Sequence, residues 1–489
     1  YKYIQMLFNS RFYLSGKHAI LFIEDFEEMR LNPVMEKEKN DFTKGSVTKN
    51  IINQAVPMTL AQLINVLYSI VDRIYIGRMG QDAALALGGV GITFPIITII
   101  MAFANLIGMG GAPLCSIERG KGNQKKAEEI MGNSFFLLIL LGLLLTAVIL
   151  IFKKPIIYAF GASEATFPYA DSYITIYLLG SVFVMIGLGM NSFINSQGFA
   201  RTGMLTVLIG AVLNIILDPV FIFILHLGVR GAALATVISQ FVSSVWVLLF
   251  LAGRKTILKL KKENFRLKFR LVRQIVTLGL SGFTMSVTNS IVQIACNATL
   301  QVYGGDLYVT VMTILNSIRE VITMPVTGIT NGAQPVLGYN YGAEQYERVK
   351  AAIRFMTLAC IGYTFIVWGI LLLAPHFFIH IFNSSPEIIA KGVPALKLYF
   401  FGIFMMSLQF SGQSTYIALN RSRQAIFFSI FRKVVIVLPL TVCLPMLFGL
   451  GVNGVFIAEP VSNFIGGTAC YVTMLLTVYR KLKDSGEQA

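Results

Sequence analysis

The sequence predicts an all-α integral membrane protein with twelve transmembrane helices arranged as two pseudo-symmetric six-helix bundles. Three observations predict this fold: an apolar composition, twelve apolar segments of spanning length, and an internal repeat. Hydrophobic residues make up 55% of the 489 positions and charged residues 13%, about half the charged share of an average soluble domain. We therefore expect lipid, rather than water, to surround most of the chain.

Apolar segments of about twenty residues, the length that crosses a hydrocarbon core of about 30 Å, alternate with glycine, proline and charged residues. Six lie in the first half of the chain, near 51–77, 86–117, 133–152, 166–190, 203–225 and 231–252. Six more lie in the second half, near 274–302, 308–337, 352–373, 394–418, 424–447 and 453–478.

The two halves of the chain repeat each other. GKGNQKKA at 120–127 aligns with GAEQYERV at 342–349, and GVRGAALA at 228–235 aligns with GVNGVFIA at 451–458, an offset of 222–223 residues. Six spans separate the copies, so both copies have the same membrane orientation. This repeat predicts two six-helix bundles that face a central cavity.

The segments and the repeat divide the chain into five parts. They are a cytoplasmic N-terminal segment at 1–50, a first bundle at 51–252, a basic cytoplasmic linker at 253–273, a second bundle at 274–479 and a cytoplasmic tail at 480–489. Residues 1–34 read equally well as native or as sequence upstream of the native start, because Met35 opens an ordinary hydrophilic stretch.

The formal net charge of +16 is carried mainly by loops between the apolar segments. Basic residues gather at the even-numbered connections and at the C-terminus, so the positive-inside rule predicts a multi-pass protein of the cell membrane with both termini in the cytoplasm. The basic linker could bind anionic lipid or nucleic acid, but a solvated hinge between the two halves explains its charge without a partner. We therefore expect the lipid bilayer as surroundings, no nucleic-acid partner and a monomer.

Four polar residues inside the apolar segments are candidates for a cation site. They are Asp72, Asn214, Asp218 and Thr236. At 1.5 Å per residue, both acids lie roughly 20–25 Å from the cytoplasmic side, and Thr236 lies roughly 8 Å from the other side, which is the same depth in a core of about 30 Å. We therefore expect the four side chains to meet.

Two carboxylates, an amide oxygen and a hydroxyl could take up a proton or hold a hard cation such as Na⁺. A structural explanation is also available, because Asp72 could pair with the adjacent Arg73 while Asn214 and Asp218 bond across helices. Adjacent helix positions point about 100° apart, which weakens the pairing of Asp72 with Arg73.

Several of these residues stand in a recognisable pattern. Pro57 precedes Asp72 by fifteen positions, Asn214 to Pro219 form an N-x-x-x-D-P run, and Thr236 ends a G-x-x-G-A-A-x-A-T run. With the repeated glycine-rich loops, this pattern resembles the multidrug and toxic compound extrusion (MATE) family over residues 45–480, and its MepA-like bacterial branch in particular.

The resemblance implies a transporter that exchanges Na⁺ or H⁺ for amphiphilic, often cationic, small molecules. It matches Asp72, Asn214, Asp218 and Thr236 to the family's cation site in the first bundle. It also matches Pro57 to a proline associated with bending of the first helix, although a packing kink without a gating role explains this proline equally well.

The second bundle offers fewer acids. The repeat offset places Cys296, Val437, Thr441 and Glu459 opposite the four candidate residues, and only Glu459 of these could ionise. Glu320 and Glu459 are candidate substrate-cavity residues that would attract cations, and a purely structural role is equally consistent with each. Coupling through the first bundle is therefore favoured.

The function expected from these features is secondary active multidrug efflux by alternating access, with H⁺ or Na⁺ as the coupling ion and no other cofactor, no metal site and no catalytic residues. A flippase for lipid-linked glycans, or a metabolite exporter of the same superfamily, is the alternative. The apparent scarcity of inward-facing basic residues argues against the flippase. An integral-membrane enzyme would need a paired-aspartate motif or a catalytic histidine beside an acid, and the sequence offers neither.

Overall fold

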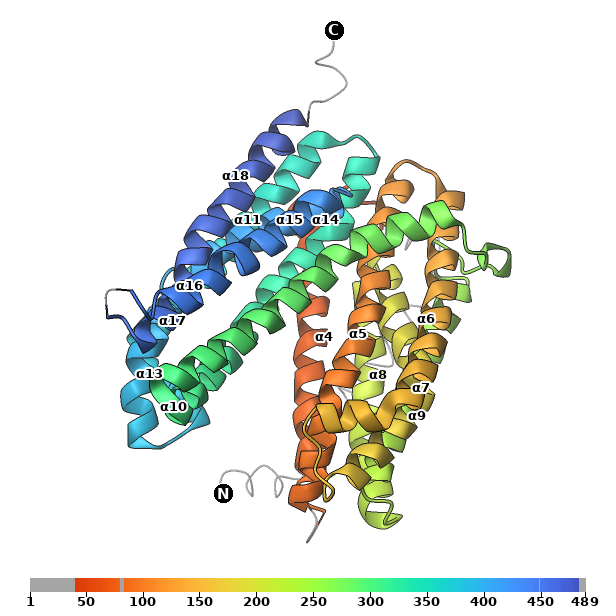
Figure 1. Cartoon of the computed structure of the whole chain (residues 1–489). Coiled ribbons are helices and arrows are strands. Elements are labelled where there is room, and N and C mark those ends of the chain that lie inside the picture. The colour runs from red at the N-terminus through yellow and green to blue at the C-terminus, as the bar shows by residue number, and fades with distance from the viewer. Residues whose placement is uncertain (1–39, 80–82, 448, 483–489) are drawn as a thin grey trace, which may run out of the picture. The chain divides into compact units, whose positions relative to one another are not determined.

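The computed structural model describes residues 40–79, 83–447 and 449–482, and these residues form helices and connecting loops without strands (Figure 1). Every helix described here belongs to one compact unit that begins at Phe42. The expectations for residues 1–34 and for most of the tail lie outside the described residues.

The first bundle contains one helix for each of the six expected segments. These are α4 (Val47–Ile76), α5 (Ala83–Gly120), α6 (Gln124–Ala159), α7 (Phe167–Ser196), α8 (Ala200–Pro219) and α9 (Val229–Ala252), with a π-helical turn, η1 (Val220–Ile224), extending α8. Helix α7 packs against α5, α6 and α9, while α8 packs against α4 and α9. The candidate residues on α4, α8 and α9 are therefore held on neighbouring helices.

The second bundle begins with α10 (Phe269–Gly342), which is two helices joined at a kink. Gly305 has φ 64° at this kink, a left-handed conformation that glycine adopts without strain. The remaining elements are α11 (Tyr346–Leu373), α12 (Pro375–Phe382), α13 (Pro386–Tyr399), η3 (Ile403–Met405), α14 (Met406–Ala418), α15 (Ser422–Ile430), η4 (Phe431–Val437), α16 (Leu438–Cys443), α17 (Val452–Ser462), η5 (Asn463–Gly467), α18 (Thr468–Thr477) and η6 (Tyr479–Lys481).

Counting these elements as membrane spans confirms the expected fold class. Among the described residues, ten helices are long and apolar enough to cross a membrane, and α13 with η3 and α14 forms an eleventh span bent by 43°. Since α10 contributes two helices, the total is the expected twelve. Two features were not foreseen: the short helix α12, and the π-helical segments η4 and η5 inside the last two spans.

The two bundles touch where α10 crosses α5 (Figure 1). A Cβ atom on Gly279 would collide with the carbonyl oxygen of Leu106, and one on Gly110 would collide with the carbonyl oxygen of Ile275. Only glycine lets the two backbones approach this closely, as is common at helix crossings in membranes.

The linker is attached to the first bundle rather than free in solvent. The Gln197 Oε1 atom accepts hydrogen bonds from Thr256 Oγ1 at 2.8 Å, Ile257 N at 3.0 Å and Leu258 N at 2.7 Å. Leu258 is fully buried. The expectation of a solvated hinge is therefore wrong at Thr256–Leu258, because a buried side-chain acceptor fixes the backbone there.

Charged contacts continue this attachment toward α10. Glu128 accepts from Lys259 N at 3.1 Å and forms an ion pair of 2.8 Å with Lys261, while Lys268 pairs with Glu129 at 2.8 Å. The hydrogen bond to Glu128 raises the pKa of Lys261 above its ordinary value, so the lysine stays charged at neutral pH. Helix α10 then begins at Phe269, earlier than the expected start near residue 274.

Candidate functional site

Three of the four candidate residues are joined directly. Asn214 and Asp218 lie one turn apart on α8, so they share a face of the helix. The Asn214 Nδ2 atom donates to Asp218 Oδ1 at 3.3 Å and to Thr236 Oγ1 on α9 at 3.4 Å. The Asn214 side chain therefore links α8 to α9 at the depth where we expected the four candidate side chains to meet.

The fourth residue, Asp72, completes the cluster from α4. Its carboxyl group lies close to that of Asp218, and both residues are buried. Asp72 Oδ1 and Asp218 Oδ2 have no hydrogen-bond donor within the described parts of the chain. Two ionised carboxylates only accept hydrogen bonds and repel each other, so a shared proton or a cation between the two groups would stabilise this arrangement.

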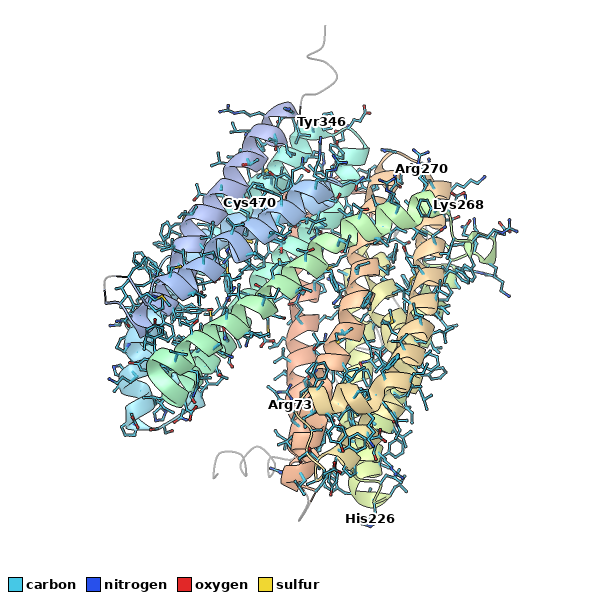
Figure 2. All side chains as sticks on the ribbon, in the orientation of Figure 1. Arg73, His226, Lys268, Arg270, Tyr346 and Cys470 are labelled. Carbon is cyan, nitrogen blue, oxygen red and sulfur yellow. The ribbon has the colours of Figure 1, made fainter. Side chains whose placement is uncertain are left out.

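The alternative pairing of Asp72 with Arg73 is not formed. The Arg73 guanidinium instead lies over the ring of Phe94, 4.6 Å from its centroid, and Asp72 Oδ1 has no hydrogen-bond partner among the described residues. Arg73 and His226 lie toward one end of the first bundle, whereas Lys268 and Arg270 lie at the other (Figure 2). Asp72, next to Arg73, therefore lies far from the basic linker.

Aromatic hydroxyl groups surround the four polar residues. Tyr173 on α7 is buried and lies near Thr236, and its ring stacks on that of Tyr177 one turn later, with centroids 6.3 Å apart. Tyr68 lies on α4 one turn before Asp72. These tyrosines were missed from the sequence, where their four-residue spacing was the only available signal.

A cavity of about 40 Å³, with several polar side chains in its lining, adjoins the cluster. A buried water needs about 10–15 Å³ by the same kind of measure, so the cavity has room for a few waters or a partly hydrated ion. Its lining includes Asn65, Tyr68, Asn191, Asn214, Thr236 and Ser239. Asn191 Oδ1, Asn214 Oδ1 and Ser239 Oγ are buried without a partner in the described residues, so oxygen ligands are available.

Pro57 lies inside α4 at its contact with the second bundle. The helix continues through this proline, although the ring removes the hydrogen bond that the Asn53 carbonyl would otherwise accept. A Cβ on Gly332 of α10 would lie 2.6 Å from the Ala55 Cα, and one on Gly328 would collide with the Thr59 side chain. Pro57 therefore lies between two close approaches of α4 to α10, at Ala55 and at Thr59.

Glu459 in the second bundle is enclosed by three cationic side chains. Its Oε1 atom lies 2.7 Å from Arg432 Nη2, 3.1 Å from Lys433 Nζ and 3.1 Å from Arg319 Nη2. Glu459, Arg432 and Lys433 are all buried. The carboxylate is thus already paired, which leaves it little capacity to attract a cationic substrate.

This cluster corrects the premise that inward-facing basic residues are scarce. Arg432 and Lys433 lie in η4, within the segment expected near 424–447, and both are buried. The signal was present in the sequence, because two adjacent cations inside an apolar span need an explanation. A scarcity of inward-facing basic residues therefore no longer disfavours a flippase.

The other residues considered in the second bundle form no matching acidic cluster. Cys296 Sγ lies 3.7 Å from Thr441 Oγ1, and Val437 is buried nearby in the same core. Glu320 on α10 is exposed, and the neighbouring Arg319 pairs with Glu459 rather than with Glu320. The structure therefore does not bring Glu320 and Glu459 together as one acidic site.

Comparison with known families returns a match in each half of the chain. The MatE family model matches residues 57–220 and 282–443, and so covers more than half of the chain. The two matched segments correspond to the two copies of the internal repeat.

Similarity to individual proteins extends over most of the chain. Multidrug export protein MepA of Staphylococcus haemolyticus is 26% identical over 428 residues, which are 87% of this chain and 93% of that protein. A solved structure of a MATE in the bent conformation has a TM-score of 0.85 at 22% identity, covering 91% of this chain and 98% of that one. A MOP superfamily transporter from Pyrococcus furiosus, described as having a binding pocket of reverse polarity, has a TM-score of 0.84 at 23% identity, covering 91% and 99%.

Proposed function

Because this chain belongs to the MatE family, we propose that it is a secondary active exporter of amphiphilic small molecules, including drugs, which exchanges them for H⁺ or Na⁺ by alternating access. The export of drugs is supported by the similarity to MepA proteins, which are named as multidrug export proteins. The proposal also includes a monomer in the cell membrane. The distribution of basic residues supports a cytoplasmic position for both termini.

The observation that carries the ion exchange is that two buried carboxyl groups, those of Asp72 and Asp218, lie close together. The two acids come from different helices, so a proton or Na⁺ between them favours a close approach of α4 to α8. Without the ion, two negative charges in an apolar bundle repel each other. Ion binding would therefore change the position of α4.

Helix α4 links this ion site to the packing of the two bundles. Ala55 and Thr59 contact Gly332 and Gly328 of α10, and Pro57 lies between them. A helix that lacks one backbone hydrogen bond bends more easily at that point. We propose that loading of the Asp72–Asp218 pair bends or straightens α4 at Pro57, which exchanges one packing of α4 on α10 for another.

The ion and the substrate would then bind one after the other, each to a different arrangement of the two bundles. A coupled exporter must bind its ion better in one arrangement than in the other, since a ligand with equal affinity for both shifts nothing. The closeness of the two acids meets this condition, because a small movement of α4 changes the attraction for a cation steeply.

The test is transport in proteoliposomes that contain the purified full chain. A fluorescent lipophilic cation is supplied on one side, and its movement is followed under an imposed H⁺ gradient, an imposed Na⁺ gradient, or neither. The proposal expects movement against the substrate's own gradient with at least one of the two ions. Movement that is identical in all three conditions would contradict ion exchange.

A flippase for lipid-linked glycans is the second candidate, and the cationic cluster around Glu459 is the observation that favours it. Its substrate carries phosphate groups, which arginine and lysine bind well. The same proteoliposomes can be tested with a fluorescent polyprenyl-diphosphate glycan. Translocation of this glycan, with no movement of the amphiphilic cation, would support the flippase and contradict the exporter.

A further inference from the structure

The charges around Glu459 do not balance. Three cationic side chains, Arg319, Arg432 and Lys433, contact this one carboxylate, which leaves an excess of two positive charges when all four are ionised. Lys433 contacts both carboxylate oxygens, at 3.1 and 3.2 Å. No other acidic side chain pairs with any of the three cations within the described residues.

Neutral groups supply the remaining contacts and cancel no charge. Asn463 Oδ1 accepts a hydrogen bond from Arg432, and the Tyr399 hydroxyl accepts one from Arg319 Nη1 at 2.9 Å. Arg432 is 4% exposed, and its Nε atom has no partner in the described part of the chain. A buried guanidinium with a free donor is a position where an additional acceptor is expected.

The local backbone suits a binding site. Arg432 and Lys433 lie in the π-helical segment η4, which packs against the π-helical segment η5 that begins at Asn463. Such segments inside α-helices are frequently found at functional sites. Arg319 reaches the cluster from α10, where its side chain is 22% exposed, whereas those of Arg432 and Glu459 are 5% and 7% exposed. A ligand would therefore enter past Arg319.

We propose that Arg319, Arg432 and Lys433 form an anion-binding site in the second bundle that receives a carboxylate group of the transported molecule. The exported class then includes zwitterionic and anionic amphiphiles, not only cations. This inference rests on the proposed export function for the identity of the ligand. Arginine presents paired N–H groups that match the two oxygens of a carboxylate, so a carboxylate fits this site better than a spherical anion does.

Direct binding tests the site without any transport step. The purified full chain in lipid–detergent micelles is titrated with radiolabelled benzoate in a sodium isethionate buffer. Unlabelled benzoate, chloride, the neutral isostere benzamide and the cation benzylamine serve as competitors. We expect saturable benzoate binding that unlabelled benzoate displaces and that benzamide and benzylamine do not.

Variants of the accessible residue connect this binding to the cluster. Arg319→Gln should weaken benzoate binding by about ten-fold or more, and Arg319→Lys should weaken it less, because the charge remains while the paired donors are lost. Arg230→Gln, which removes an exposed arginine at the start of α9 in the first bundle, is the matched control and should bind benzoate as the unchanged protein does. Thermal unfolding of each variant verifies that it is folded.

Three results would overturn the proposal: no saturable benzoate binding, equal binding by folded Arg319→Gln, or displacement by chloride as effective as by benzoate, which indicates an inorganic-anion site. Benzoate binding in a protein that transports nothing under any gradient would uphold the anion site and contradict the export function instead. The failures of the two proposals are thus distinguishable.

Discussion

Asn214 holds Asp218, one helical turn further along α8, through a hydrogen bond of 3.3 Å from its Nδ2 atom to the Oδ1 atom of the aspartate. The same amide nitrogen lies 3.4 Å from Thr236 Oγ1 on α9. The amide therefore orients one oxygen of Asp218, while the other, Oδ2, has no hydrogen-bond partner among the described residues. This arrangement makes Asn214 a positioning residue for the pair of acids.

Replacing Asn214 by leucine should impair coupling while the helices still pack, because leucine has a similar volume and no amide. A hydrogen bond to a charged group contributes about 1.5–3 kcal/mol, so the ion concentration for half-maximal transport should rise about ten-fold or more. Transport is measured against H⁺ and Na⁺ concentration in proteoliposomes. Thr236→Val, which keeps the hydrogen bond from Asn214 to Asp218 and removes the more distant contact of the amide, is the control with a smaller expected change. An unchanged ion dependence in Asn214→Leu would show that the amide does not position the site.

The crossing of α5 and α10 predicts a stability effect. A Cβ on Gly279 would collide with the Leu106 carbonyl, so Gly279→Ala must push the two helices apart. Overpacking of this kind costs about 1–3 kcal/mol, and the thermal unfolding temperature should fall by several degrees. Gly362→Ala is the matched control, because nothing lies within 4 Å of a Cβ at Gly362. Equal unfolding temperatures of the two variants would contradict the close crossing.

The attachment of the linker predicts protection from proteolysis. Gln197→Ala removes the acceptor for three donors of Thr256–Leu258, and each unsatisfied buried donor costs about 1–3 kcal/mol. Trypsin should then cleave near Arg254 and Lys255 at least about ten times faster than in the unchanged protein. Gln124→Ala, which removes one exposed hydrogen bond to Ile257 O, should have a much smaller effect. Equal cleavage of both variants would mean that Gln197 does not hold the linker.

Glu320 stays a predicted cavity residue, and its exposure allows a test by charge. Glu320→Gln should weaken export of dicationic compounds more than export of monocationic ones, because Coulomb attraction scales with substrate charge. Export of matched compounds is compared at equal expression and an identical imposed gradient. Glu387→Gln, which neutralises an exposed acid at the start of α13, is the control. Equal loss for neutral, singly and doubly charged compounds would point to a coupling or folding defect instead.

The sequence predicted the parts of this protein that depend on helix geometry and hydropathy. A fixed rise per residue placed Asp72, Asp218 and Thr236 at one depth before their contacts were known. The π-helical segments could not be foreseen, because hydropathy does not report the local hydrogen-bond register. The linker attachment could not be foreseen either, since it depends on one side chain, Gln197, from a distant segment. Arg432 and Lys433 were overlooked although their positions inside an apolar span were visible.

The proposed ion coupling depends most on the pair of acids, Asp72 and Asp218. The most direct measurement of it is gradient-driven export by Asp72→Asn and Asp218→Asn in proteoliposomes. Each variant should lose export under both H⁺ and Na⁺ gradients while it remains folded, with an unfolding temperature equal to or above that of the unchanged protein. The reason is that each substitution removes a buried charge, which relieves repulsion but abolishes the shared proton or cation. Normal gradient-driven export by both variants would contradict the account and place the coupling site elsewhere in the chain.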